Sequence, residues 1–172
     1  MLTTTTDTRD SQKARVYGAD QQVRRMFDTA RKTGSTLVSV ANSDLVLPSE
    51  ILFGSLDGVR TYLTVVQSSD WYRDCWPTSP PVKVRQRRGN RLAHYSQGTI
   101  ALHDDQQRGA HWAMRELVVL HELAHHVTPK DPGHGAAFCG AFVYLVNNAM
   151  GPVAGFVLMH AFDTNGCHQI QH

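Results

Sequence analysis

The chain has 172 residues, a formal net charge of +2 and 41% hydrophobic residues, which suffices for one domain with a real core. No stretch approaches the roughly 18 apolar residues of a membrane span, and the polar, threonine-rich start shows no secretory signal. The three cysteines, Cys75, Cys139 and Cys167, are too few and too widely spaced for a disulfide framework or a zinc knuckle. These features predict a cytoplasmic protein without a membrane partner.

The residue pattern predicts one domain over residues 11–165, flanked by a disordered tail over 1–10 and a loose tail over 166–172. In the N-terminal half, apolar residues recur twice at helical spacing, and a β-branched run lies between these two segments. The expected elements are a helix over 11–32, a strand over 36–40, a connection over 42–53, a helix over 56–68 and a loop over 69–81. The aromatic residues of that loop, Trp71, Tyr72 and Trp76, are expected to anchor it on the core.

The C-terminal half begins with alternating apolar and charged residues and continues with apolar stripes at helical spacing. The expected elements are strands over 82–87, 92–95 and 99–102, followed by helices over 109–127, 134–150 and 152–162. Turn residues between the strands predict an antiparallel meander. The first of these helices has apolar residues on nearly every side, so we expect it to be buried. The sequence therefore predicts an α+β fold in which a small antiparallel sheet packs on several helices.

The segment His121-Glu122-Leu123-Ala124-His125 lies inside this buried helix. Two histidines four residues apart share one helix face, so their ring nitrogens can bind one tetrahedral Zn²⁺. The glutamate between them is poorly placed as a ligand but can act as general base on the attacking water. The alternative is an ordinary buried helix whose histidines satisfy backbone groups. The chain contains only three glutamates, Glu50, Glu116 and Glu122, which makes a chance occurrence of this motif rare.

A catalytic zinc site needs a third protein ligand and one open position. His134 is the main candidate, because a proline-containing turn brings the chain back and a helix start would keep its imidazole neutral. Asp131 remains an alternative ligand, since carboxylates also bind Zn²⁺. His126 points about 100° round the helix from His125 and is expected to be structural or to support a ligand.

The order of these elements resembles a known enzyme fold. An antiparallel sheet that leads into an HExxH helix resembles the zincin fold of metallopeptidases, and the segment His134-Gly135-Ala136-Ala137-Phe138 is similar to the third-ligand segment of SprT-like zinc proteases. Most of the chain resembles a family of actinobacterial metallohydrolases whose members lack an assigned substrate. That resemblance rests on Asp10, Ser11, Gln12, Val16 and Tyr17, and on Arg87, Arg88, Gly89, Ala93, His94 and Tyr95.

The resemblance implies a zinc-dependent hydrolase, a metallopeptidase that cleaves a peptide or protein substrate. It implies His121, His125 and His134 as ligands of one Zn²⁺ and Glu122 as general base. In zincins the strand before the motif helix is a sheet edge that binds an extended peptide by strand addition, and here that strand is 99–102. Neither the metzincin continuation nor a thermolysin-type second glutamate follows the motif, which leaves the third-ligand role almost entirely to His134.

Two further groups of residues bear on function. The candidates for the donor that stabilises the reaction oxyanion are Tyr95, His94, Tyr144 and His160. The basic residues Lys83, Arg85, Arg87, Arg88 and Arg91 raise nucleic acid as a partner, although a solvated strand face is the favoured interpretation.

Two other functions compete with the hydrolase. The first is a non-catalytic zinc-binding domain with a structural or partner-binding role. Structural zinc sites use four protein ligands, often with cysteine, whereas three histidines leave a position open. The second is a nuclease or deaminase-like metal hydrolase, which is disfavoured because the H-x-E and P-C-x-x-C signature of zinc deaminases is absent.

Overall fold

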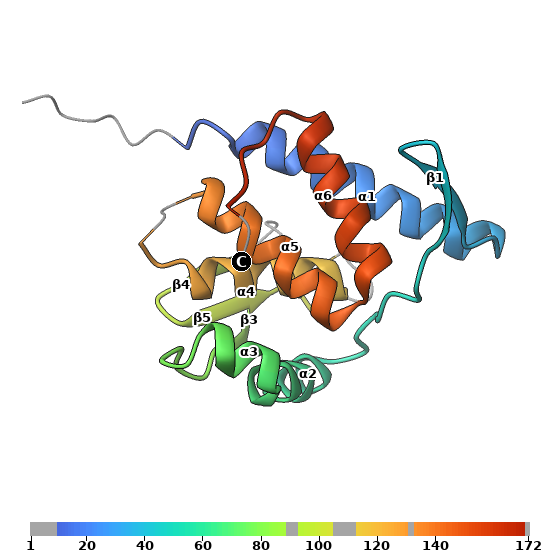
Figure 1. The fold of residues 1–172 in the computed structure, drawn as a ribbon. Coiled ribbons are helices and arrows are strands. Elements are labelled where there is room, and N and C mark those ends of the chain that lie inside the picture. The colour runs from blue at the N-terminus through green and yellow to red at the C-terminus, as the bar shows by residue number, and fades with distance from the viewer. Residues whose placement is uncertain (1–9, 89–92, 105–112, 131–132, 171–172) are drawn as a thin grey trace, which may run out of the picture.

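The computed structural model describes residues 10–88, 93–104, 113–130 and 133–170. Their helices and two small sheets form an α+β arrangement (Figure 1). In chain order the elements are α1 (Lys13–Thr33), β1 (Leu37–Val40), β2 (Ser43–Val46), α2 (Leu56–Ser68), α3 (Asp70–Cys75), β3 (Lys83–Gln86), β4 (Ala93–Ser96), β5 (Thr99–Leu102), α4 (Glu116–Val127), α5 (Ala136–Ala149) and α6 (Pro152–Thr164). None of the described helices is long and apolar enough to cross a membrane.

Helix α1 forms where the sequence predicts it and ends at Gly34, whose φ of 72° lies in the left-handed region. The strand that follows, β1, pairs with a second strand, β2, that the sequence prediction missed. Ala41 and Asn42 connect the two strands with φ values of 50° and 60°. Positive φ at both positions is the hairpin turn that matches the twist of paired strands. The usual glycine of such a turn is missing here, which hid the hairpin in the sequence.

Helix α2 begins after Ser55, whose Oγ accepts a hydrogen bond from the Gly58 N–H at 3.1 Å, as expected for a helix cap. The segment predicted as an aromatic loop contains the short helix α3. Tyr72 is buried, and Trp71 and Trp76 are partly buried against the core. The expectation that these aromatic side chains anchor the segment is therefore confirmed.

The three-stranded sheet differs from the predicted antiparallel meander. Its strand order is β3-β5-β4, and β5 pairs in parallel with β3 and antiparallel with β4. Strand β5 is therefore the central strand, and the prediction that residues 99–102 form a sheet edge is wrong. The physical reason is that Ile100, Ala101 and Leu102 are all buried. The most apolar strand takes the position in which both of its neighbours cover it.

Helix α4, which carries the HExxH motif, is buried on nearly all sides as predicted, but it begins at Glu116 instead of residue 109. Residues 113–115 are not helical, because the chain pairs there with residues 51–53. The Phe53 N–H donates to the Met114 carbonyl at 2.8 Å, and the Glu116 N–H donates to the Ile51 carbonyl at 3.0 Å. This pairing fixes the start of the motif helix.

Helix α5 lies between α4 and α6, and α1 packs along α6 (Figure 1). The expected apolar stripe of α5, which includes Phe138, Phe142 and Leu145, is buried. The prediction of a loose C-terminal tail does not hold for residues 166–170. Cys167 is buried, and the Ile170 N–H donates to the Ala136 carbonyl at the start of α5 at 3.0 Å.

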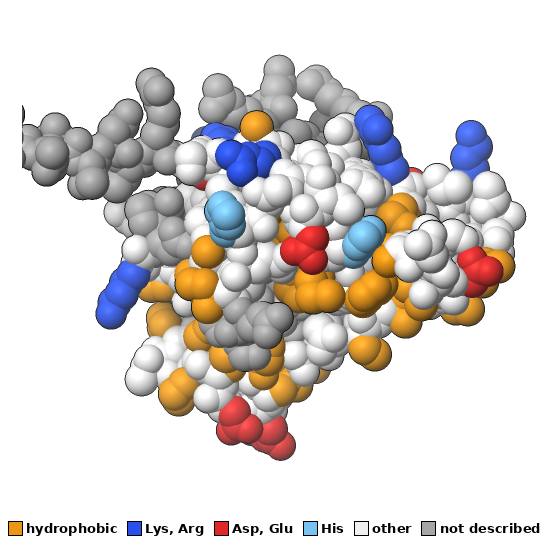
Figure 2. All heavy atoms as spheres, turned by 45° about the horizontal axis from the view of Figure 1, so that its top comes forward, with side chains coloured by type: hydrophobic (Ala, Val, Ile, Leu, Met, Phe, Trp, Pro, Cys, Tyr) orange, Lys and Arg blue, Asp and Glu red, His pale blue; other side chains and the backbone are white. Residues whose placement is uncertain are grey.

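Seen from the side of α1 and α6, hydrophobic side chains gather in a band with histidine and acidic side chains beside it (Figure 2). A cavity of about 810 Å³ lies between α5, α6 and the C-terminal segment.

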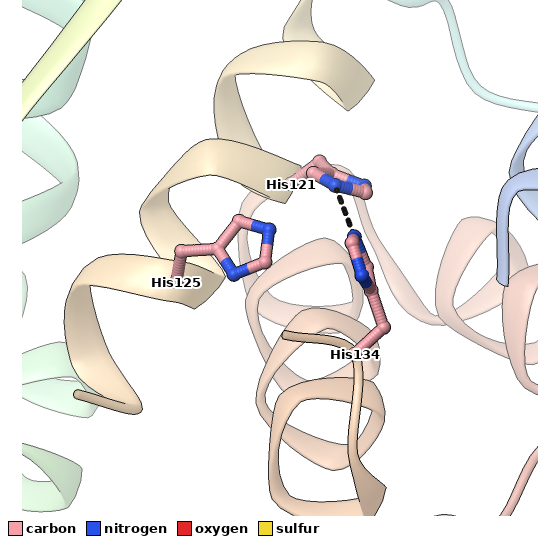
Figure 3. A group of neighbouring side chains, drawn as sticks. All are labelled: His121, His125 and His134. Carbon is pink, nitrogen blue, oxygen red and sulfur yellow. Dashed lines mark hydrogen bonds between the residues drawn. The ribbon is translucent and has the colours of Figure 1, made fainter. Parts of the chain in front are cut away.

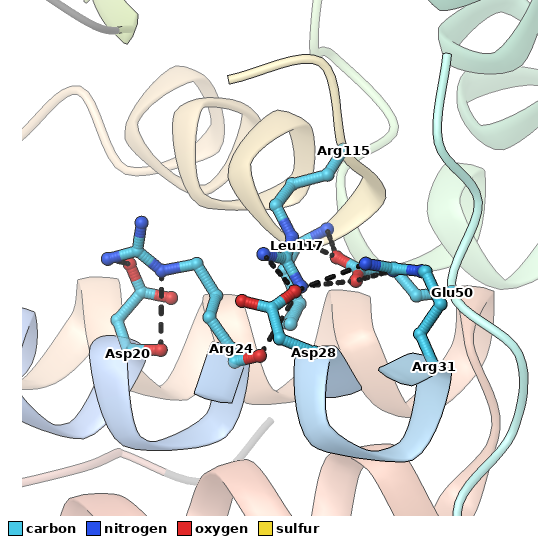
Figure 4. A network of polar contacts seen from close by, with 7 residues as sticks. All are labelled: Asp20, Arg24, Asp28, Arg31, Glu50, Arg115 and Leu117. Atoms are coloured by element: carbon cyan, nitrogen blue, oxygen red, sulfur yellow. Dashed lines mark hydrogen bonds and ion pairs between the residues drawn. The ribbon is translucent and has the colours of Figure 1, made fainter. Parts of the chain in front are cut away.

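Buried charges join α1 to the start of α4 (Figure 4). Arg115, which is 3% exposed, pairs with the fully buried carboxylate of Glu50 at 2.5 Å and with Asp28 of α1 at 3.0 Å. Glu50 also accepts from Arg31 of α1 at 3.2 Å and from the Leu117 N–H in the first turn of α4 at 3.3 Å. A carboxylate at this position satisfies a free backbone donor and the positive end of the helix dipole. The network therefore sets how α1 lies against the motif helix.

Candidate metal centre

The three histidines predicted as ligands lie together (Figure 3). His121 and His125 project from successive turns of α4. His134 comes from the turn before α5, which begins at Ala136, two residues after the helix start that the sequence predicted. Each offers one ligand atom, and these atoms all lie within 4.8 Å of one another. The Nε2 atoms of His121 and His134 are 3.4 Å apart. Two ligands of a tetrahedral zinc at about 2.0–2.1 Å are separated by roughly 3.3–3.4 Å, so this pair has the spacing that a zinc ion requires.

Burial keeps the cluster in the form that binds metal. Burial, and then the nearby rings of His125 and His134, lowers the pKa of His121 well below its ordinary value. Burial lowers the pKa of His125 to about 3. Neutral imidazole is the ligand form, so the site does not have to lose protons from these two rings near neutral pH.

Phe138 holds the three rings in place. It is fully buried, and its ring centroid lies 4.4 Å from that of His125, 4.8 Å from that of His134 and 5.0 Å from that of His121. A rigid side chain in contact with all three rings limits their rotamers. The sequence placed this residue at the end of the His-Gly-x-x-Phe segment and in the apolar stripe of its helix, with no indication that it touches all three histidines.

Asp10 is a residue of the site that the sequence placed in the disordered tail. The Nδ1–H of His134 donates to Asp10 Oδ2 at 2.6 Å, and the His134 N–H donates to Asp10 Oδ1 at 3.1 Å. Gly133 permits this approach, because a Cβ at that position would lie 2.7 Å from the carboxylate. Its φ of 94° also favours glycine. The domain therefore includes Asp10, ahead of the predicted boundary at residue 11.

Glu122 is 7% exposed and lines a cavity of about 370 Å³ beside the histidine cluster. The other residues that line this cavity are Asp10, Lys13, Tyr17, Ala93, His94, Tyr95, His125, Thr128, Pro129, Gly133 and His134. Burial raises the pKa of Glu122 to about 8, although the Tyr95 N–H donates to its carboxylate and opposes that rise. A nearby cation lowers the pKa of a carboxyl group, so metal binding would favour the ionised base.

The four predicted oxyanion donors are not equally placed. Tyr144 donates to the Trp71 carbonyl at 3.3 Å, and His160 stacks on Phe156 of α6, so neither lines the cavity. Tyr95 and His94 do line it.

The hydroxyl proton of Tyr95 already has an acceptor. Nε2–H of His126 donates to the Pro80 carbonyl at 2.8 Å, and Nδ1 therefore accepts from the Tyr95 hydroxyl at 3.1 Å. Burial lowers the pKa of His126, which keeps this ring neutral. His126 thus contacts the sheet and a loop, in agreement with its predicted structural role.

Sequence reasoning missed Tyr17 of α1. Its ring stacks on His121 with centroids 5.8 Å apart and lies 5.0 Å from the ring of His134. Burial, and then the charges of Glu122 and Asp20, raises the pKa of Tyr17, so the phenol keeps its proton. The side chain is 44% exposed and lines the cavity, which makes it available to a substrate. In the sequence Tyr17 stood only among the residues that carry the family resemblance, with no indication that its ring contacts the histidines.

The structure does not describe every residue that the sequence singled out. Asp131, the alternative third ligand, and Arg91 of the basic cluster lie outside the described residues. Of the remaining basic residues, Lys83, Arg85 and Arg88 are exposed and Arg87 is half-buried. Nothing in this arrangement favours a nucleic acid over solvent.

Comparison of this chain with models of known protein families, with curated proteins and with solved structures finds no match. The site is therefore interpreted from its own geometry.

Proposed function

We propose that this chain is a zinc-dependent metallohydrolase, and that it acts as a metallopeptidase of the zincin type. The observation that supports this most directly is the three-histidine cluster next to a buried glutamate, at the wall of an open cavity. Three neutral imidazoles are a common ligand set of catalytic zinc, and the fourth position is then left for the reaction. A buried four-ligand site would instead favour a structural role.

In this mechanism His121, His125 and His134 hold the zinc ion. When bound, the ion supplies a Lewis acid that polarises the substrate carbonyl and acidifies water. Glu122 accepts the proton of the attacking water at its carboxylate and delivers it to the nitrogen of the leaving amine. The Tyr95 N–H, which donates to Glu122, holds that carboxylate in position.

Strand β4 is the sheet edge closest to the proposed chemistry. It pairs only with β5 among the described strands, and Ala93, His94 and Tyr95 line the cavity that contains Glu122. An extended peptide can add to such an edge through backbone hydrogen bonds. We therefore assign the substrate-binding role to β4 in place of residues 99–102.

Metal binding is the first test of the function. The purified chain is expected to bind one Zn²⁺, and His134→Ala is expected to weaken binding by roughly 100-fold or more. Zinc sites with four ligands contribute about 10–16 kcal/mol, so each ligand carries on average about 2.5–4 kcal/mol. Competition with a chromophoric chelator measures the affinity. His160→Ala, which removes a histidine outside the cluster, is the matched control and should bind like the parent protein.

Hydrolysis is the second part of the same test. The zinc-loaded chain is expected to cleave an unfolded protein such as casein, to lose this activity with a chelator and to regain it with added zinc. Tight binding of one zinc without cleavage of casein or a mixed-sequence peptide library would instead support the non-catalytic zinc domain.

Tyr17→Phe is expected to lower kcat by about 10²–10³-fold, the usual effect of losing one oxyanion donor. Phenylalanine keeps the ring contacts with His121 and His134, so the zinc affinity should change by no more than about twofold. Steady-state kinetics together with chelator competition separates the two effects. An unchanged kcat would transfer the donor role to His94, because of the two predicted donors that line the cavity Tyr95 already gives its hydroxyl proton to His126.

A further inference from the structure

One face of α1, together with the residues just before the helix, lies beside the histidine cluster. Lys13, Tyr17 and Asp20 share this face at helical spacing, and the first two line the cavity. Asp10 lies just before the helix and reaches the same site. Two of these residues, Asp10 and Asp20, place a carboxylate behind a histidine ring, on the side opposite the point where the Nε2 atoms converge.

The hydrogen bonds between the N-terminal segment and His134 are fully formed. Asp10 accepts from both the ring Nδ1–H and the backbone N–H of His134. Gln12 Nε2 donates to the His134 carbonyl at 3.1 Å. The side chain and both backbone polar groups of this histidine are therefore held by two residues, Asp10 and Gln12, which are more than 120 positions away in the sequence. Such contacts fix the orientation of the ring and the tautomer with a free Nε2.

The contact between Asp20 and His121 is slightly too long for a hydrogen bond. Asp20 Oδ2 lies 3.8 Å from His121 Nδ1, and Arg24 pairs with the same carboxylate at 3.4 Å. Within the described part of the chain, Asp20 Oδ1 and His121 Nδ1 are buried atoms without a hydrogen-bond partner. A buried polar atom without a partner is costly, and a shift of about 1 Å would bring Asp20 Oδ2 within hydrogen-bond distance of His121 Nδ1.

The tautomer of His121 explains why this donor and acceptor face each other. Its Nε2 is the atom that lies 3.4 Å from Nε2 of His134. If Nε2 binds a metal, the ring proton must be on Nδ1, where it needs an acceptor. The carboxylate of Asp20 is the acceptor on that side. Carboxylates behind metal-binding histidines make the ring more basic and hold its orientation.

We propose that Asp10 and Asp20 are positioning residues that orient His134 and His121 for metal binding, so that α1 forms the outer layer of the site. This inference rests on the proposed function, because it assumes that the three histidines bind a metal. It adds that the N-terminal helix, which supplies no ligand, sets the affinity of the centre.

The test measures the dissociation constant of Zn²⁺, and the visible spectrum of bound Co²⁺, for the parent chain and for Asp10→Asn and Asp20→Asn. Each substitution keeps the size of the side chain and removes its charge. Each is expected to weaken zinc binding by about 10–100-fold and to change the Co²⁺ absorption bands. Asp57→Asn is the matched control, because Asp57 on α2 is a carboxylate that is 87% exposed and far from the cluster in sequence. Its zinc affinity should stay within about twofold of the parent value.

Metal-free melting temperatures separate positioning from simple stabilisation. A purely structural role would lower the melting temperature in chelator and leave the affinity of the folded chain unchanged, and that result would overturn the inference. If Asp20→Asn does not fold, Asp10→Asn decides alone, because its side chain is 24% exposed and lies outside the helices. Failure of the parent chain to bind metal would reject the proposed function itself. Tight one-to-one binding that both variants keep would reject only the role of the two aspartates.

Discussion

Replacement of Glu122 by glutamine is expected to abolish hydrolysis while one zinc ion stays bound. Glutamine keeps the shape of the side chain and can still accept a hydrogen bond from the Tyr95 N–H. It cannot take a proton from water at neutral pH. General-base catalysis contributes about 10²–10⁴-fold, so kcat should fall by that factor, whereas none of the three ligands is changed. The measurement is kcat of parent and variant after both have been loaded with one equivalent of zinc.

Glu116→Gln provides the matched control for this experiment. Glu116 is the other glutamate of α4, and its carboxylate accepts from the Tyr62 hydroxyl at 2.7 Å and the Ile51 N–H at 3.0 Å, away from the cluster. The same substitution there is expected to leave kcat of the folded chain within about twofold. A Glu122→Gln variant that kept the parent kcat would remove the general-base assignment, even with zinc bound.

The largest expected effect on stability is that of Glu50→Ala. This substitution removes the fully buried partner of Arg115 and leaves a guanidinium that is 3% exposed, with Asp28 at 3.0 Å and the Arg24 carbonyl at 3.5 Å as its remaining partners. Breaking a buried ion pair from one side costs about 3–5 kcal/mol. The loss of the hydrogen bond from Leu117 N–H at the start of α4 adds to that. Since domains of this size unfold with about 5–15 kcal/mol, urea unfolding should show a large decrease in the midpoint.

Asp57→Ala tests whether burial is the cause. Asp57 pairs with Arg60 at a comparable distance, but the two side chains are 87% and 48% exposed. Exposed pairs contribute about 0–1 kcal/mol, so the free energy of unfolding should fall by no more than about 1 kcal/mol. Equal losses for the two variants would mean that the network of Figure 4 contributes no more than an ordinary surface pair.

The sequence predicts those features that depend on local spacing. The helical repeats locate α1, α2, α5 and α6. The spacing of His121 and His125 puts both on one face of a buried helix, and the turn before α5 returns His134 to them. These predictions succeed because a helix converts sequence distance directly into position.

The features that escaped prediction depend on contacts between distant segments. Turn residues locate strands but do not determine their partners, so the parallel pairing of β3 with β5 was not foreseen. Asp10 and Asp20 looked like a tail residue and an ordinary helix residue, because their histidine neighbours are 124 and 101 positions away. Tyr17 escaped prediction for the same reason, because the histidines that it contacts are also distant in the sequence.

The hydrogen bonds of Gln12 affect the order in which the centre can assemble during synthesis of the chain. Its side chain donates to the His134 carbonyl and accepts from the His168 N–H at 2.5 Å, and so links α1, the third histidine and the segment after α6. The two histidines of α4 leave the ribosome long before residue 168. A nascent chain can therefore expose the HExxH helix while the frame around the third histidine is still incomplete. If the centre binds zinc as proposed, an ion captured at that stage would be held loosely until residue 168 has joined this frame.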